Sequence, residues 1–207
     1  KFKNNLSLNF VQSGKRTYQD FYNEVTSIAN YLLSSGIRKG DKIAILSANM
    51  PNWGITQFAI ARIGAIAVPV LPGFSSIEIQ NILEHSESKI IFVSKLLYKL
   101  VADIKTSYLE QKILMNTFAR IPEDYPVEAI DKLENNIGLD NLTPLPAIQV
   151  EEEDTASIIY TSGTTGFSKG VELTHRNLVW NARQCATIQP VSIQDRFLSI
   201  LPLAHTY

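Results

Sequence analysis

The alternation of apolar and polar positions predicts helices and short strands that follow one another along the chain. Early in the sequence, apolar side chains recur every three or four positions, which is the period of a helix with one buried face. Thr17 and Asp20 have the spacing of a capping box at the start of that helix, and Gly36 suits its end. The next apolar run, Lys42–Ser47, predicts a strand, and Pro51 suits the first turn of a second helix.

The same pattern continues through the middle of the chain. Ile66–Val70 and Lys89–Val93 have the length of buried strands, and Ser75 with Glu78 predicts a second capping box that opens a helix between them. A short helix and one more strand are expected beyond them, at residues 96–101 and 112–115. Strands that alternate with helices are typical of a parallel sheet covered on both faces. We therefore expect an α/β fold, a layered and mainly parallel sheet with flanking helices.

The pattern breaks into proline, asparagine and acidic residues between Ile121 and Glu153. Because a strand pattern resumes directly afterwards, at Thr155–Tyr160, we interpret this stretch as a surface connection within one domain. Thr174 then predicts the cap of another helix that starts at His175.

Composition and charge exclude several kinds of partner. The 207 residues carry 19 Lys and Arg against 20 Asp and Glu, so no basic excess favours nucleic acid. The single cysteine, Cys185, excludes an internal disulfide and a multi-cysteine zinc site. No apolar run approaches the ~20 residues that span a bilayer, so we expect a cytoplasmic protein, with peripheral membrane contact left open. The chain opens on Lys1 and stops at Tyr207 without a polar tail, and we therefore expect it to be an excerpt from a longer polypeptide.

One segment combines the features that suit a polyphosphate. It follows the apolar run that ends at Tyr160 and reads Thr161-Ser162-Gly163-Thr164-Thr165-Gly166-Phe167-Ser168-Lys169-Gly170-Val171. Glycines let backbone N–H groups converge on an anion, hydroxyls add donors that can rotate, and a lysine supplies mobile positive charge. A hydroxyl-rich surface turn is the plainer interpretation, but such a turn needs no cluster of glycines, hydroxyls and a lysine together. We predict a phosphate loop at residues 160–171.

Counting positions excludes two familiar nucleotide motifs. A Walker A loop requires a second glycine five residues after the first, followed by Lys and Ser or Thr. Ser168 stands at that place after Gly163, and Lys169 is followed by Gly170. The glycines of the segment are three and four residues apart, which does not match the dinucleotide fingerprint Gly-x-Gly-x-x-Gly.

At these residues the chain resembles the AMP-forming acid–thiol ligases, the superfamily of acyl-CoA synthetases, luciferases and peptide-synthetase adenylation domains. Their phosphate-binding signature runs Thr-Ser-Gly-Ser/Thr-Thr-Gly-x-Pro-Lys-Gly-Val, and the chain departs from it at Ser168, where we expect a less rigid loop. Residues 36–41 and 61–70 are similar to other family segments, and Leu201–Tyr207 looks most like long-chain fatty acid ligases. The resemblance covers almost the whole chain and implies that residues 1–207 are the first part of the family's large N-terminal domain.

The resemblance also implies a reaction and roles for particular residues. A carboxylic acid, most like a fatty acid, would attack ATP to form an acyl-adenylate with release of pyrophosphate, and coenzyme A would then take the acyl group. Lys169 and His205 would be the catalytic residues, and Thr161 would contact Mg²⁺. The residues that would line the nucleotide phosphates are Thr161, Ser162, Gly163, Thr164, Thr165, Gly166 and Lys169. Because the later family motifs lie beyond Tyr207, we expect this chain to be inactive alone.

Several alternatives stay open at this point. Within the superfamily these are a peptide-synthetase-type adenylation domain, an aryl-acid ligase and a fatty acyl-AMP ligase. Outside it they are a non-catalytic module that binds a nucleotide or an acyl group, and an interaction domain whose loop is only structural. The acyl chain length, the thiol acceptor and the oligomeric state are not indicated by the sequence. Of the remaining candidate side chains, we expect His85 to be solvated and Cys185 to lie on a helix face or in the core.

Overall fold

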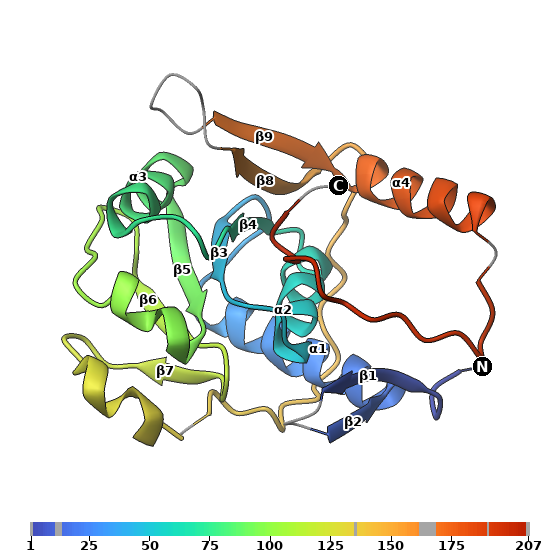
Figure 1. Cartoon of the computed structure of the whole chain (residues 1–207), viewed down its shortest axis with the longest axis horizontal. Helices are drawn as coiled ribbons and strands as arrows, with labels where there is room; N and C mark the ends of the chain where they lie inside the picture. Colours follow the sequence, from blue (N-terminus) through green and yellow to red (C-terminus); the bar gives the residue numbers. More distant parts are fainter. Residues whose placement is uncertain (1, 11–13, 135, 162–168, 190, 206–207) are drawn as a thin grey trace.

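The computed structural model describes residues 2–10, 14–134, 136–161, 169–189 and 191–205 (Figure 1). Within them, one sheet has the strand order β7-β6-β5-β3-β4-β8-β9. Its strands are β3 (Lys42–Leu46), β4 (Ile66–Val70), β5 (Ser88–Val93), β6 (Gln111–Leu114), β7 (Ala119–Ile121), β8 (Thr155–Thr161) and β9 (Lys169–Thr174). A separate antiparallel ribbon joins β1 (Leu6–Phe10) to β2 (Gly14–Thr17).

Parallel pairing dominates the middle of the large sheet. Strands β6, β5, β3, β4 and β8 are parallel neighbours, whereas β7 and β9 pair antiparallel at the two edges. The predicted α/β fold with a mainly parallel sheet is therefore confirmed, and the sheet is mixed. The two edge strands were not predicted: β7 has only three residues, and β9 is exposed along most of its length, so neither has a continuous apolar run.

Helices cover both faces of the sheet (Figure 1). They are α1 (Tyr18–Ser34), α2 (Pro51–Arg62), α3 (Ser76–Ser86) and α4 (His175–Ile188), with 3₁₀ turns η1 (Lys95–Leu100) and η2 (Val127–Lys132). Alternate residues of β3, β4, β5 and β6 divide between two apolar clusters. Ile43 and Ile45 of β3 pack with α1 and α2, whereas Ala44 and Leu46 pack with α3. The segment expected to be helical at 96–101 is the 3₁₀ turn η1.

The helix starts agree with the predicted capping residues. At α1, the Thr17 backbone N–H and hydroxyl donate to Asp20 Oδ2 at 2.9 and 2.8 Å. At α3, Ser75 makes the same two bonds to Glu78 Oε2, both at 2.7 Å. At α4, Thr174 caps the first turn in the same way, through Asn177. In each case a side chain satisfies backbone donors that the first turn leaves unpaired.

The two capping carboxylates should make the stability of the protein depend on pH in acid. Backbone and then hydroxyl hydrogen bonds hold the pKa values of Asp20 and Glu78 below their ordinary range. A pKa that is lower in the folded state gives stability that is complete above the unfolded-state pKa of ~4 and is lost as the pH falls through the folded-state value. We expect the D20N/E78Q double variant to unfold at a lower temperature than wild type at pH 7, and the difference in unfolding temperature to be smaller at pH 3. Thermal unfolding at pH 3 and pH 7 measures this difference, with E128Q on η2 as the control. An equal difference between variant and wild type at both pH values would contradict the prediction.

The segment between β7 and β8 was predicted to be a surface connection, and it lies against α1. The Ser27 hydroxyl donates to the carbonyl of Leu139 at 2.6 Å, and the Asn30 amide donates to the carbonyl of Thr143 at 2.8 Å. Leu145 and Ile148 of this segment are partly buried against the α1–α2 cluster. The connection therefore covers one side of the core while it leads the chain back to β8. Among the described residues no helix is long and apolar enough to cross a membrane.

Candidate functional site

The carboxyl ends of the parallel strands meet at one edge of the sheet. Strands β3, β4 and β8 end there at Leu46, Val70 and Thr161. In sheets of this class, ligands bind in the crevice outside the carboxyl ends of the strands, where the connecting loops begin. The segment predicted to bind phosphate starts at this edge, directly after the last residue of β8.

The structure shows the stem of that predicted loop. Strands β8 and β9 form an antiparallel hairpin in which Thr161 pairs with Lys169 and Tyr160 pairs with Gly170. Two of the predicted site residues, Thr161 and Lys169, are thus brought opposite each other, and both are exposed. The other predicted phosphate-binding residues lie outside the described residues; they are Ser162, Gly163, Thr164, Thr165 and Gly166.

A single asparagine beyond β3 holds the segment that leads to His205. The Asn49 side-chain amide donates to the carbonyl of Leu201 at 2.7 Å and to Ser199 Oγ at 3.2 Å, and its oxygen accepts from the Leu203 N–H at 2.9 Å. One side chain therefore ties the last described segment to the same edge of the sheet. The chain then turns, with the His205 N–H donating to the Pro202 carbonyl at 3.0 Å.

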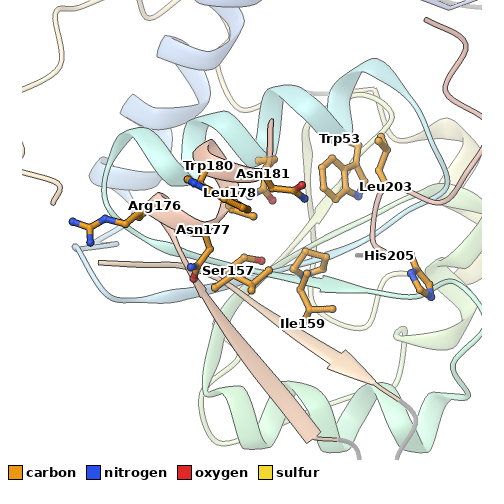
Figure 2. A pocket seen from close by; sticks show the side chains of 13 residues that line it. Trp53, Ser157, Ile159, Arg176, Asn177, Leu178, Trp180, Asn181, Leu203 and His205 are labelled. Atoms are coloured by element: carbon orange, nitrogen blue, oxygen red, sulfur yellow. The ribbon is translucent and has the colours of Figure 1, made fainter. Parts of the chain in front are cut away.

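A cavity of about 770 Å³ lies between β8, β9, α2 and α4 (Figure 2). Ser157 and Ile159 of β8 line it, and Leu203 and His205 line the end away from Arg176. Because side chains alternate along a strand, Thr161 lies on the same face of β8 as these two residues. The cavity and the hairpin stem are therefore adjacent, and His205 lines the cavity.

Most side chains around the cavity are apolar, but two buried polar atoms stand out. Trp53 Nε1 and Gln57 Oε1, one turn apart on α2, have no hydrogen-bond partner among the described residues. A buried donor or acceptor without a partner costs roughly 1–3 kcal/mol, so these two atoms lower the stability of the packing beside the cavity. Trp180 on α4 also lines the cavity, which places both tryptophans of the chain there.

The structure settles the surroundings of the other candidate side chains. His85 is exposed, as a solvated residue should be, yet its Nδ1 lies 2.7 Å from the hydroxyl of Tyr160, a bond that the sequence did not indicate. Burial raises the pKa of Tyr160, so its hydroxyl keeps its proton at neutral pH. His175 starts α4 as predicted, and Cys185 is exposed on the same helix.

Two features of the site were missed by the analysis of the sequence. Asn49 carried a weak signal, since it is a polar residue that follows a mostly apolar strand at the ligand-binding edge. The contact between His85 and Tyr160 carried none, because 75 residues separate the two side chains. No group of three or more His, Cys, Asp or Glu within the described ranges is placed to hold a metal ion.

Comparisons with known proteins identify the family of the chain. The family described as AMP-binding enzyme matches residues 2–207. The crotonobetaine/carnitine–CoA ligase of Citrobacter koseri is 34% identical over 196 residues, and the chain spans 36% of the length of that relative and 91% of its own.

Solved structures share the fold. A putative long-chain-fatty-acid CoA ligase from Rhodopseudomonas palustris has a TM-score of 0.78 at 23% identity, over 92% of this chain and 46% of the other. The O-succinylbenzoate coenzyme A synthetase of Bacillus subtilis, in complex with AMP, has a TM-score of 0.72 at 25% identity, over 99% and 48% of the two chains. The chain belongs to the AMP-binding enzyme family, the adenylate-forming ligases.

Proposed function

We propose that the protein of which this chain is a part is an AMP-forming acid–thiol ligase, which binds ATP at the β8–β9 hairpin and the acid in the adjacent cavity. The observation that carries the proposal is the pairing of Thr161 with Lys169 beside a cavity that His205 lines. A hydroxyl, an ammonium and an imidazole are thus gathered at the edge of a parallel sheet where ligands bind.

The chemistry explains why such groups are needed. A carboxylate oxygen forms a bond to the α-phosphorus of ATP while the bond from that phosphorus to the pyrophosphate oxygen breaks, which leaves an acyl-adenylate. A thiol, that of coenzyme A, then takes the acyl group and AMP leaves. Because two anions must approach each other, catalysis depends on positioning and on neutralising charge. Lys169 supplies positive charge on the triphosphate, Thr161 donates a hydrogen bond, and His205 lies where acid and nucleotide meet.

Magnesium would fit this site as a companion of the nucleotide. Mg²⁺ is commonly held by substrate phosphates and a few protein oxygens, because it dehydrates reluctantly. The described residues offer it the Thr161 hydroxyl and no cluster of carboxylates, which suits an ion held mainly by phosphate oxygens. When bound, the ion would offset phosphate charge.

The cavity supports an apolar acid as the first candidate substrate, and we propose a fatty acid. Seven of its thirteen lining residues are apolar, and burial of an alkyl chain contributes about 0.8 kcal/mol per CH₂. A second candidate is an acid that carries a quaternary ammonium, as in the substrates named for the Citrobacter koseri relative. Trp53 and Trp180 favour it, because tryptophan faces attract such cations.

Carboxylate-dependent ATP–pyrophosphate exchange by the full-length protein tests the proposal. The acid panel should include fatty, aryl, amino and quaternary-ammonium acids, each with and without coenzyme A. Exchange with a fatty acid, and thioester formation only when coenzyme A is present, is the expected result. Exchange without thioester formation would point to a fatty acyl-AMP ligase or a peptide-synthetase-type domain, according to the acid. Nucleotide binding without exchange for any acid would favour a non-catalytic binding module and contradict the proposed reaction.

The tether at Asn49 should affect the acid more than the nucleotide. We expect Asn49→Ala to raise the KM for the acid roughly tenfold, because several hydrogen bonds of about 0.5–1.5 kcal/mol each hold the segment that carries Leu203 and His205. Initial rates at saturating ATP measure the change, with Asn23→Ala on α1 as the matched control. An unchanged KM for the acid would show that this segment does not shape the acid site.

A further inference from the structure

Tyr160 is held from two sides at the base of the hairpin. It is 2% exposed, and its hydroxyl lies 2.7 Å from Nδ1 of His85, in the last turn of α3. The two rings meet edge to face, with centroids 5.7 Å apart and planes at 89°. Figure 1 shows α3 beside the end of the hairpin where β8 finishes. A helix that is remote in the sequence therefore contacts the residue just before Thr161.

The ring of Tyr160 also rests on the partner strand. A Cβ added to Gly170, the residue that pairs with Tyr160, would lie 3.2 Å from Cζ of the ring and 2.9 Å from Cγ2 of Ile158. The absence of a side chain at Gly170 is thus what lets the ring lie across β9. Tyr160 thus joins α3 to both strands of the hairpin. It directly precedes Thr161 on β8, and the glycine on which its ring rests directly follows Lys169 on β9.

We propose that His85 is a positioning residue for ATP: by holding Tyr160, it fixes the hairpin stem so that Thr161 and Lys169 face the phosphates together. The inference rests on the proposed function, since it assigns a task within the same nucleotide site. Stem residues that are already in place cost less to order when the ligand binds, and this saving appears as affinity. Loss of the contact should therefore weaken ATP binding and leave the turnover of the saturated enzyme little changed.

A second buried tyrosine provides a matched control. Tyr98 on η1 is 1% exposed, and its hydroxyl donates to the carbonyl of Tyr125 at 2.8 Å. It belongs to the same apolar cluster as Tyr160, so the loss of either hydroxyl should cost similar stability. Of the two tyrosines, only Tyr160 lies in the hairpin stem. If its hydroxyl had a purely structural role, Tyr160→Phe and Tyr98→Phe should have equal effects on the KM for ATP.

The test measures ATP–pyrophosphate exchange in the full-length protein for His85→Ala, Tyr160→Phe, the double variant and Tyr98→Phe. We expect each of the first two to raise the KM for ATP about fivefold with little change in kcat, which is the effect of one hydrogen bond. The KM for ATP of the double variant should not exceed the higher of the two single-variant values, because both substitutions remove the same contact. His85→Asn, whose amide can take the place of Nδ1, should recover most of the affinity. Tyr98→Phe should lower the unfolding temperature and leave the KM unchanged.

Two results would overturn the inference while the proposed function stands: wild-type KM values in His85→Ala and Tyr160→Phe, or an equal rise in Tyr98→Phe. A wild-type protein that neither exchanges pyrophosphate nor binds Mg·ATP would overturn the proposed function, and the positioning role with it.

Discussion

Lys169→Ala should raise the KM for ATP in pyrophosphate exchange by about 10- to 100-fold. Lys169 is the first residue of β9 and pairs with Thr161, and both lie within the predicted phosphate loop. A hydrogen bond to a charged group contributes about 1.5–3 kcal/mol, and each 1.4 kcal/mol corresponds to a factor of ten in affinity. Because the side chain is exposed, its removal should leave the unfolding temperature close to that of wild type. Exchange kinetics and calorimetry on the same samples measure the two effects.

Lys132→Ala is the matched control, since it removes an exposed lysine on η2. Its KM for ATP should equal that of wild type. Equal kinetics in the Lys169 and Lys132 variants would show that the hairpin does not bind the phosphates, and would favour the interpretation of the loop as a structural turn.

Gly170→Ala should be the most damaging small substitution in the hairpin. The added Cβ would come within 2.9 Å of Ile158 Cγ2, closer than packed carbon atoms approach, so Ile158 has to move. It would also lie 3.2 Å from Tyr160 Cζ, a tight contact that pushes the ring by a few tenths of an ångström. Overpacking of this kind costs about 1–3 kcal/mol, whereas replacing a strand glycine returns only about 0.5–1 kcal/mol of conformational entropy. The net result is a lower unfolding temperature, and the KM for ATP should rise because Lys169 is the adjacent residue.

Gly73→Ala separates this clash from the general effect of replacing a glycine. A Cβ at Gly73 meets no atom within 4 Å, and its backbone does not require a positive φ. Thermal unfolding should therefore place Gly73→Ala within about 0.5 kcal/mol of wild type. If the two alanine variants unfold at the same temperature, the tight packing of Tyr160 on β9 is not a feature of the protein in solution.

Local patterns were enough to predict the elements whose residues are neighbours in the sequence. The capping boxes at Thr17 and Ser75 were correct because a helix start depends on residues three positions apart. Strands β4 and β5 were found because strands buried on both faces are continuous apolar runs. The family resemblance, which the family match confirmed, was visible in the sequence for the same reason, because its signature is a contiguous segment.

The features that the sequence did not reveal depend on distant pairs of residues. The edge strand β9 is exposed along most of its length and has no continuous apolar run, and its pairing with β8 became apparent only in the fold. Asn49 contacts a segment about 150 residues away, and His85 contacts Tyr160 across 75 positions. In each case the partner is chosen by the packing of whole elements, which periodicity does not encode. The roles of Ser162–Gly166 stay predictions from the signature alone.

The most direct test of the account is a crystal structure of the full-length protein grown with ATP and magnesium. We expect electron density for the triphosphate at the stem of the β8–β9 hairpin, with its oxygens within hydrogen-bond distance of Thr161 Oγ1 and Lys169 Nζ, and the adenosine at the edge of the sheet where the parallel strands end. A nucleotide bound away from this hairpin, in crystals that diffract well enough to place it, would contradict the assignment of the phosphate site.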